Sequence, residues 1–234
     1  MIRPIGPVPG KLAVDLHVHT CFSRDSLTTL PALVEAVGRR GLNALAVTDH
    51  NCIEGALRLR DLAPFPVIVG EEVLTSEGEI IGLFLERPVP RRLSPSETIA
   101  AIREQGGLLY LPHPADSVRR STLRWNAVLS VVAQMDLVEV FNARNLRAAD
   151  NATAQRLAAA YGRPGAGGSD AHTPGEVGQA YTLLPTCDLT SPAAFLAAAR
   201  GSEVRGTSSS PLVHFSSTAA KIIKRLPQPL RRCP

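Results

Sequence analysis

The chain has 234 residues, of which 44% are hydrophobic and 20% are charged, a composition typical of a soluble globular protein. No apolar run approaches the length of a membrane span, and the first ten residues, MIRPIGPVPG, lack the apolar core of a signal peptide. We therefore expect a cytoplasmic protein without a membrane span. The net charge of +4 comes from the last fourteen residues, because without their five basic side chains residues 1–220 carry −1. This pattern predicts a solvated tail more than a surface for nucleic acid or an anionic membrane.

Short apolar runs alternate with helical patterns along the chain. The predicted strands cover residues 12–16, 44–47, 67–69, 108–111, 137–141 and 165–168, and a hairpin over residues 75–85 turns at Glu77-Gly78. The predicted helices lie near residues 30–40, 54–62, 95–105, 122–133, 146–161 and 191–200. The segment Ser94-Pro-Ser-Glu97 is a helix capping box.

Strands that alternate with helices predict a parallel sheet with helical crossovers. The number of units favours one barrel over two domains, and a (β/α)8 barrel usually needs more residues than this chain has. We therefore expect an α/β fold with a distorted seven-stranded barrel in residues 12–212. It would be flanked by an N-terminal extension, residues 1–11, and the basic tail, residues 213–234.

Polar residues follow the predicted strands at their carboxyl ends, the face on which barrel enzymes build their sites. His17 and His19 follow the first strand, and because residues i and i+2 of an extended chain point to the same side, both imidazoles should aim at one point. Asp25 lies in the loop that follows. The remaining strand-end residues are Asp49, His50, Glu72, His113, Asn142, Asp170 and His172. We interpret the sixth histidine, His214, as structural.

Imidazoles and carboxylates without paired thiolates are typical ligands of Zn, Mn or Fe, with Mg as a further candidate. None of the four cysteines forms a CxxC pair, which argues against a thiolate zinc site. The candidate groups exceed the roughly four to six that one ion takes, so the sequence predicts two or three divalent metal ions. Such clusters make hydroxide from water near neutral pH and stabilise phosphoryl transfer.

These motifs resemble those of the polymerase and histidinol phosphatase (PHP) superfamily. The shared motifs, in chain order, are HxH at residues 17–19, TDH at 48–50, GxE at 70–72, PHP at 112–114 and GSDAH at 168–172. The resemblance covers roughly residues 12–205. It implies a distorted (β/α)7 barrel that holds two or three metals and hydrolyses phosphoesters.

The resemblance also implies a distribution of the ligands among three ions. His17, His19, Glu72 and Asp170 would hold the first ion. Glu72 would bridge to the second, which His113 would complete.

Asp25, His50 and His172 would hold the third ion, with Asp25 where some relatives have histidine. Glu79 stands near a position where many relatives carry a histidine, so it is a candidate ligand of the second ion. We expect Asp49 to orient a ligand and, with His172, to take part in catalysis.

Basic residues near the site are the expected phosphate ligands. Asn142 and Arg144 follow the fifth strand, and Arg119 and Arg120 follow His113 on the next loop. The guanidinium group of arginine offers a planar pair of donors that matches a phosphate. Arg144 is also expected to neutralise charge that develops during catalysis.

The sequence thus predicts a metal-dependent phosphoesterase that hydrolyses a small phosphomonoester or nucleotide with metal-activated water. Alternatives in the same class are a 5′→3′ exonuclease, acting on nucleic-acid ends, and a nucleoside-bisphosphate phosphatase. An amidohydrolase is a further alternative, although none of the three lysines lies at a strand end, where a metal-bridging carboxylated lysine would have to be. The last alternative is a non-catalytic PHP regulatory module.

Overall fold

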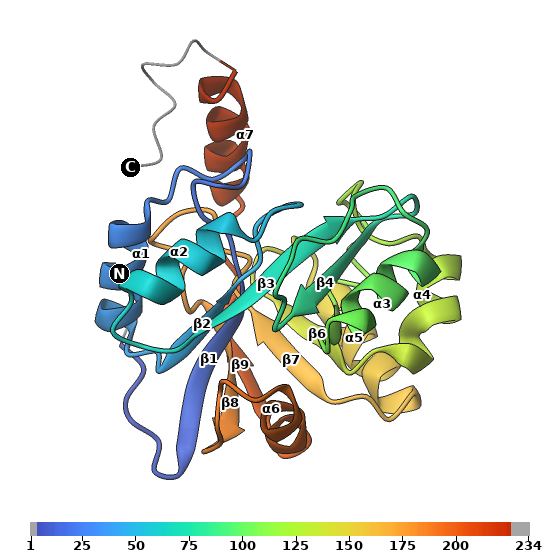
Figure 1. Ribbon diagram of the computed structural model, residues 1–234. Helices are drawn as coiled ribbons and strands as arrows, with labels where there is room; N and C mark the ends of the chain where they lie inside the picture. The colour runs from blue at the N-terminus through green and yellow to red at the C-terminus, as the bar shows by residue number, and fades with distance from the viewer. Residues whose placement is uncertain (1–3, 226–234) are drawn as a thin grey trace.

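The computed structural model of the protein describes residues 4–225 (Figure 1). Its strands form one sheet in the order β7-β6-β5-β4-β3-β2-β1-β8-β9. The strands are β1 (Lys11–Val18), β2 (Ala44–Val47), β3 (Val67–Leu74), β4 (Glu79–Leu83), β5 (Leu108–Leu111), β6 (Leu137–Asn142), β7 (Gly165–Gly168), β8 (Ala180–Pro185) and β9 (Glu203–Gly206).

The sheet curls into a nearly closed barrel. The pairs β1–β2, β2–β3, β5–β6 and β6–β7 are parallel, whereas β4 is antiparallel to both β3 and β5. The two ends of this series meet where Val18 forms a parallel bridge with Ala171. There the Asp170 N–H donates to the His17 carbonyl (2.7 Å) and the His19 N–H to the Ala171 carbonyl (2.9 Å). The carboxyl ends of β1 and β7 therefore lie side by side.

The predicted α/β barrel class is confirmed, but the expected strand number was wrong, because residues 4–225 contain nine strands and not seven. The hairpin expected over residues 75–85 enters the sheet as β4 together with the end of β3. Strands β8 and β9 add an antiparallel ribbon to the free edge of β1. No strand was expected at β8 or at β9. The residues of β9 are mostly exposed and follow no apolar alternation.

Helices follow most of the strands and cover the outside of the sheet, as Figure 1 shows. Local signals in the sequence begin and end them: Thr29 caps the first, Gly41 ends it with φ of 77°, and the capping box of Ser94 and Glu97 forms as expected. The helices are α1 (Leu30–Arg40), α2 (Glu54–Leu62), α3 (Pro95–Glu104), α4 (Trp125–Val131), α5 (Ala148–Ala160), α6 (Pro192–Ala199) and α7 (Val213–Ile223), and a short 3-10 helix, η1 (Val132–Gln134), follows α4.

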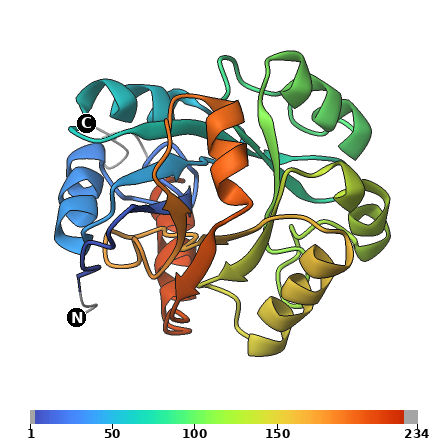
Figure 2. The ribbon, with the colours of Figure 1, turned by 90° about the horizontal axis from the view of Figure 1, so that it is seen from below.

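The barrel interior is apolar at its amino end and polar at its carboxyl end. Leu16, Ile81 and Tyr110 belong to a buried cluster that also contains Phe195 of α6. Figure 2 shows α6 lying across the amino end of the barrel. Because α6 packs over this apolar end, the polar part of the interior opens toward the carboxyl ends of the strands.

The end of the described chain departs from the expected solvated tail. Residues 213–223 form the helix α7, which rises from the carboxyl end of the barrel (Figure 1). The rest of the expected tail, residues 226–234, lies outside the described residues. Among residues 4–225, no helix combines the length and apolar character needed to cross a membrane.

Candidate metal centre

All the predicted metal ligands converge at the carboxyl end of the barrel. They come from β1 and its following loop, the loop after β2, the β3–β4 hairpin, and the loops after β5 and β7. Only His50 is partly exposed among them. The group consists of His17, His19, Asp25, His50, Glu72, Glu79, His113, Asp170 and His172.

The innermost group combines ligands from the end of β1, from the loop after β7 and from β3. The Nε2 atoms of His17 and His19 lie 3.2 Å apart. Glu72 Oε2 lies 3.4 Å from the first of these nitrogens and 3.3 Å from the second. Asp170 Oδ1 lies 3.7 and 3.3 Å from the same two atoms. Two imidazole nitrogens and two carboxylate oxygens thus surround one small volume.

Glu72 connects this group to a second one. Its Oε1 lies 2.9 Å from His113 Nε2, while its Oε2 lies 3.1 Å from His50 Nδ1. Glu79, on β4, adds a buried carboxylate whose oxygens lie 3.8 Å from His113 Nε2 and 3.6 Å from His50 Nδ1. The antiparallel pairing of β3 with β4 places Glu79 opposite Leu74 and turns its carboxylate to the same end of the barrel.

The outermost group is formed by Asp25, His50 and His172. The carboxylate oxygens of Asp25 lie 3.4 Å from His50 Nε2 and 3.4 Å from His172 Nε2. Lys221 of α7 also reaches this carboxylate, with its Nζ 3.3 Å from Asp25 Oδ2. A positive charge therefore already faces this part of the cluster.

Hydrogen bonds on the outer side of three imidazoles fix which nitrogen is free to bind a metal. His17 Nδ1 lies 3.0 Å from a carboxylate oxygen of Glu139, and His172 Nδ1 lies 2.8 Å from the carbonyl of Asp170. Both partners only accept, so both Nδ1 atoms carry the proton. Ser23 Oγ donates to Asp49 and therefore accepts from His19 Nδ1, 3.1 Å away. Each Nε2 lone pair then points into the cluster, as in metal sites whose histidines are oriented by outer partners.

Glu139 is a site residue that the sequence analysis missed. Its buried carboxylate accepts from His17 Nδ1, the Tyr110 hydroxyl, the His113 backbone N–H and the Asn142 amide. It therefore positions two of the candidate ligands from one point in the barrel. An acid inside the apolar run Leu137–Asn142, LVEVFN, was the signal that could have identified it.

Four carboxylate oxygens in the cluster are buried without a hydrogen-bond donor: Asp25 Oδ1, Glu72 Oε2, Glu79 Oε2 and Asp170 Oδ1. A buried charged acceptor without a donor is costly, and buried charges are normally paired or coordinate a metal. All four atoms face imidazole nitrogens of the cluster. Their arrangement therefore calls for cations between the carboxylates and the imidazoles.

The pKa directions agree with this arrangement. Burial opposes ionisation of Asp170, but Arg119 and His17 hold the pKa of its carboxyl well below the ordinary value. Burial and the neighbouring His19 lower the pKa of His172 to about 3, so this imidazole is neutral and able to bind a metal. Burial and Glu72 raise the pKa of Glu79. A cation bound between these two carboxylates would relieve their repulsion.

Two of the candidate ligands have unusual backbone conformations. Asp170 has φ of 53° and His113 has φ of 28°, in the left-handed region that side chains other than glycine seldom occupy. Such conformations cost roughly 1–3 kcal/mol each and are concentrated at functional sites. The backbone at Asp170 and His113 is therefore held in strained conformations that direct their side chains into the cluster.

Asp49 lies outside the cluster, although it was expected among the catalytic residues. Its buried carboxylate accepts from the Thr20 N–H (2.7 Å), the Thr20 hydroxyl (2.5 Å) and the Ser23 hydroxyl (2.6 Å). Through Ser23 it reaches His19 Nδ1. This geometry corresponds to the expected orienting role.

The four expected phosphate ligands lie in different environments. Arg119 lines the cavity next to the cluster, with its Nη2 2.5 Å from Asp170 Oδ2. Arg120 is exposed and does not line this cavity. The Asn142 amide is buried and donates to Glu139 (2.9 Å), behind the cluster, and to the candidate ligand Asp170 (3.3 Å). Its geometry suits a positioning role better than substrate binding.

Arg144 is buried at the base of α7. Its Nη2 donates to Ser217 Oγ (2.7 Å) and to the Val213 carbonyl (3.1 Å), and its Nε lies 3.5 Å from Glu176 Oε1. It also lines the cavity. Arg144 is therefore a link between α7 and the site as well as a candidate phosphate ligand.

The cavity beside the cluster has a volume of about 380 Å³. One of its ends is formed by the outermost group of ligands. Its remaining walls come from the loops after β5 and β6 and from α7. The lining residues are Asp25, His50, Asp116, Val118, Arg119, Ser121, Arg144, Leu146, His172, His214, Ser217 and Lys221. His214, for which a structural role was expected, is among the residues that line this cavity.

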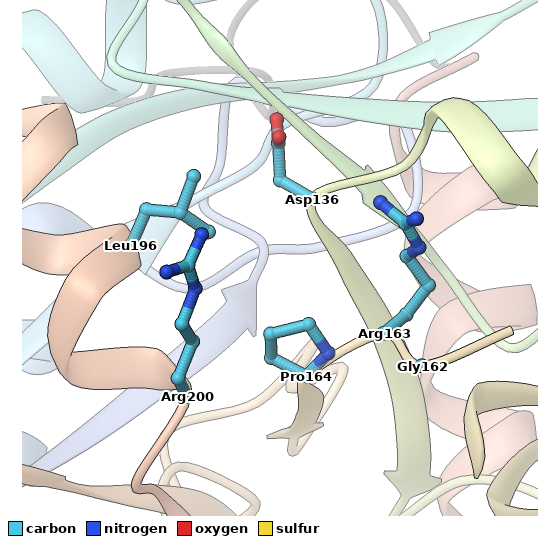
Figure 3. Close-up of a pocket in the computed structure, with 6 residues that line it drawn as sticks. All are labelled: Asp136, Gly162, Arg163, Pro164, Leu196 and Arg200. Carbon is cyan, nitrogen blue, oxygen red and sulfur yellow. The ribbon is translucent and has the colours of Figure 1, made fainter.

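A larger cavity of about 510 Å³ lies at the amino end of the barrel (Figure 3). Figure 3 shows Arg163 and Arg200 on either side of Pro164, with Asp136 beyond them. Asp136 is already paired with Arg103, at 2.6 Å. Because this cavity lacks the clustered imidazoles and carboxylates of the carboxyl end, we place the chemistry at the smaller cavity.

Comparisons with known proteins agree with the motifs and the fold. The model of the PHP domain matches residues 15–73, and that of a PHP-associated region matches residues 148–204. The uncharacterized protein MJ1587 of Methanocaldococcus jannaschii is 37% identical over 147 residues, which cover 56% of this chain and 82% of the relative.

Two solved structures share the fold. One is a two-domain protein from Bacteroides vulgatus that contains a predicted PHP-like metal-dependent phosphoesterase, with a TM-score of 0.69, 21% identity and coverage of 87% of this chain and 67% of that one. The other is the lesion-specific endonuclease PfuEndoQ from Pyrococcus furiosus, with a TM-score of 0.58, 16% identity and coverage of 83% and 57%. With its motifs, its barrel and these matches, the chain belongs to the PHP domain family.

Proposed function

We propose that the protein is a metal-dependent phosphoesterase that hydrolyses a small phosphomonoester or nucleotide. The observation that carries the proposal is the set of four buried carboxylate oxygens that face imidazole nitrogens and have no hydrogen-bond donor. Oxygen and nitrogen donors of this kind fit Zn, Mn or Fe. Divalent ions at this site would supply an activated water and would neutralise charge on the phosphoryl oxygens.

The chain's own residues would contribute orientation and positive charge. Glu139 and Ser23 hold His17 and His19 with their Nε2 atoms directed inward. Arg119 lies at the boundary between the cluster and the cavity, where its guanidinium group would bind a phosphate held against the ligands. Asp170 fixes this guanidinium group by the hydrogen bond at 2.5 Å.

A nucleic acid is the second candidate substrate, because the endonuclease PfuEndoQ has the same fold. The small volume of the cavity favours a small phosphoester over a nucleic-acid strand. An amidohydrolase with a bridging carboxylated lysine is disfavoured. Lys11 opens β1 at the amino end and pairs with Glu203. Lys221 and Lys224 reach the site from α7 and its end, and neither stands at the end of a barrel strand.

The test combines metal analysis with phosphate release. The purified protein is expected to hold two to three divalent ions per chain by elemental analysis and to release inorganic phosphate from aryl phosphates or mononucleotides. A chelator should abolish this release, and added Mn or Zn should restore it. His17→Ala, which removes an inner ligand, should lose both metal and activity. One ion or fewer in active protein would contradict the multi-metal reading, and no phosphate release across a broad panel of phosphoesters would contradict the proposed function.

A further inference from the structure

The helix α7 is oriented opposite to an ordinary surface helix. A surface helix normally turns its apolar side to the core and its polar side to solvent. In α7, the polar residues His214, Ser217 and Lys221 face the cavity. On the outer side, Phe215 is 72% exposed and Ile222 is 57% exposed. Burial of its large apolar side chains therefore does not explain why α7 lies over the site.

Polar and charged contacts hold α7 in place. At its first turn, Arg144 donates to the Val213 carbonyl and to Ser217 Oγ. At its end, Lys224 Nζ donates to the carbonyls of Cys21 and Ser23, in the loop that carries Asp25. Both anchors join α7 to segments that also carry site residues, so its position is set by the site.

The cavity-facing groups of α7 have unused capacity to bind an anion. Ser217 Oγ accepts from Arg144, which leaves its own hydroxyl proton to be donated. Lys221 Nζ lies 3.3 Å from Asp25 Oδ2, and its side chain is 44% exposed. A divalent ion bound by Asp25 would repel this ammonium group from the carboxylate. Lys221 would then be available to a phosphate that occupies the cavity beside the ligands.

Part of the cavity lining is apolar. Val118 and Leu146, from the loops after β5 and β6, line it and are 49% and 47% exposed. Apolar side chains beside a charged end are typical of a pocket for a molecule with an apolar body and an anionic group. The volume of about 380 Å³ lies near the lower end of the roughly 300–1,000 Å³ range of ligand pockets, so it suits one small molecule.

We propose that α7 is the substrate-binding wall of this site, with Ser217 and Lys221 binding the phosphate opposite Arg119. The leaving alcohol, such as a nucleoside, lies against Val118 and Leu146. This inference rests on the proposed function and narrows its substrate class to monoesters of mononucleotide size. A nucleic-acid strand that continued beyond the first nucleotide would meet α7.

The test compares Lys221→Met and Ser217→Ala with wild-type protein, and with Lys11→Met as the matched control. Lys11 lies at the opposite end of the barrel and pairs with Glu203. The substrates are AMP and a 5′-phosphorylated ten-nucleotide DNA strand, both with Mn. Binding of inorganic phosphate to the Mn-loaded protein is measured separately by calorimetry, and bound metal by elemental analysis.

We expect Lys221→Met to raise KM for AMP and the dissociation constant of phosphate about tenfold, the effect of losing one charged hydrogen bond. Ser217→Ala should have a smaller effect in the same direction. Bound metal should not fall in either variant, and Lys11→Met should behave as wild type. Wild-type kcat/KM should be higher for AMP than for the DNA strand.

Unchanged KM and unchanged phosphate binding in Lys221→Met, with wild-type protein active, would overturn the inference and leave the proposed function standing. A DNA strand that is hydrolysed as efficiently as AMP would also overturn it. If wild-type protein hydrolysed nothing but bound phosphate in a manner that depends on Lys221, the proposed function would fail and the phosphate-binding role of α7 would hold.

Discussion

Replacing Glu139 with glutamine tests whether the outer partners of the histidines control metal binding. The substitution keeps the size of the side chain and removes only its charge and one acceptor oxygen. The wild-type carboxylate accepts four hydrogen bonds, from His17, Tyr110, His113 and Asn142. An amide has one acceptor oxygen, and its NH₂ group would face donors.

The size of the effect follows from this count. About two of the four donors would lose their acceptor, and each buried unsatisfied donor costs roughly 1–3 kcal/mol. The free energy of unfolding should therefore fall by about 2–6 kcal/mol. Loss of an outer partner of a metal-binding histidine typically weakens metal binding 10–100-fold, and we expect a change of about this size for Glu139→Gln.

Two measurements separate these effects. Metal affinity is measured by titration against a competing chromophoric chelator, and stability by urea unfolding with the chelator in excess. The matched control is Glu71→Gln. Glu71 is also buried and lies next to Glu72, but among residues 4–225 its carboxylate accepts only from the Val89 N–H, and burial raises the pKa of this carboxyl to about 7. We expect this control to bind metal almost as the wild type does.

The reasoning would be refuted if Glu139→Gln bound metal with wild-type affinity. It would also fail if the two variants lost affinity equally, because a general effect of removing a buried charge would then suffice. Loss of affinity in Glu139→Gln alone would assign the orientation of His17 to this carboxylate.

Three further changes give separate tests. Glu79→Gln should lose about one metal equivalent by elemental analysis and need more added metal for activity, whereas full metal content would remove this residue from the ligands. In Gly168→Ala the new Cβ would lie 2.4 Å from side-chain atoms of both Glu139 and His17. The free energies of unfolding and of metal binding should therefore each become less favourable by about 1–3 kcal/mol. Gly175→Ala is the control, because nothing lies within 4 Å of its new Cβ. Ser94→Ala should cost about 1 kcal/mol in denaturant unfolding at neutral pH. Hydrogen bonds from Ser94 lower the pKa of Glu97. The stability that the ionised Glu97 contributes is therefore present above its ordinary pKa near 4.5 and is lost as the pH falls through the lowered pKa. The difference in stability between Ser94→Ala and wild type should accordingly shrink in acid.

The elements were predictable where the signal is local. The helix over residues 30–40 begins after the capping residue Thr29 and ends at Gly41, and both signals directly adjoin the segment that they delimit. The strand ends were predictable for a similar reason, because an apolar run followed by a histidine or a carboxylate can be recognised without knowing the rest of the fold. Barrel geometry then implies that these ends meet.

The remaining features depend on contacts between distant segments. Glu139 reaches His17 across 122 residues of sequence, and only closure of the barrel brings the two together. The edge strand β9 forms because β8 offers it an antiparallel partner, and its own residues give little indication of a strand. The helical periodicity of α7 predicts which residues lie on the same face of the helix, but not that its polar face is turned toward the cavity.

The hydrogen bonds that close the barrel run between residues that also belong to the candidate metal centre. His17 and His19 stand on one side of the closure and Asp170 on the other, joined by two backbone hydrogen bonds. Ions held across this line would link the end of β1 to the loop after β7, two segments that are far apart in sequence, and cross-links that close long loops stabilise a fold most. Metal binding and closure of the barrel would then be thermodynamically coupled. Slow amide exchange at His19 and Asp170 would report metal binding directly, and a variant that binds metal poorly would also open first along this line.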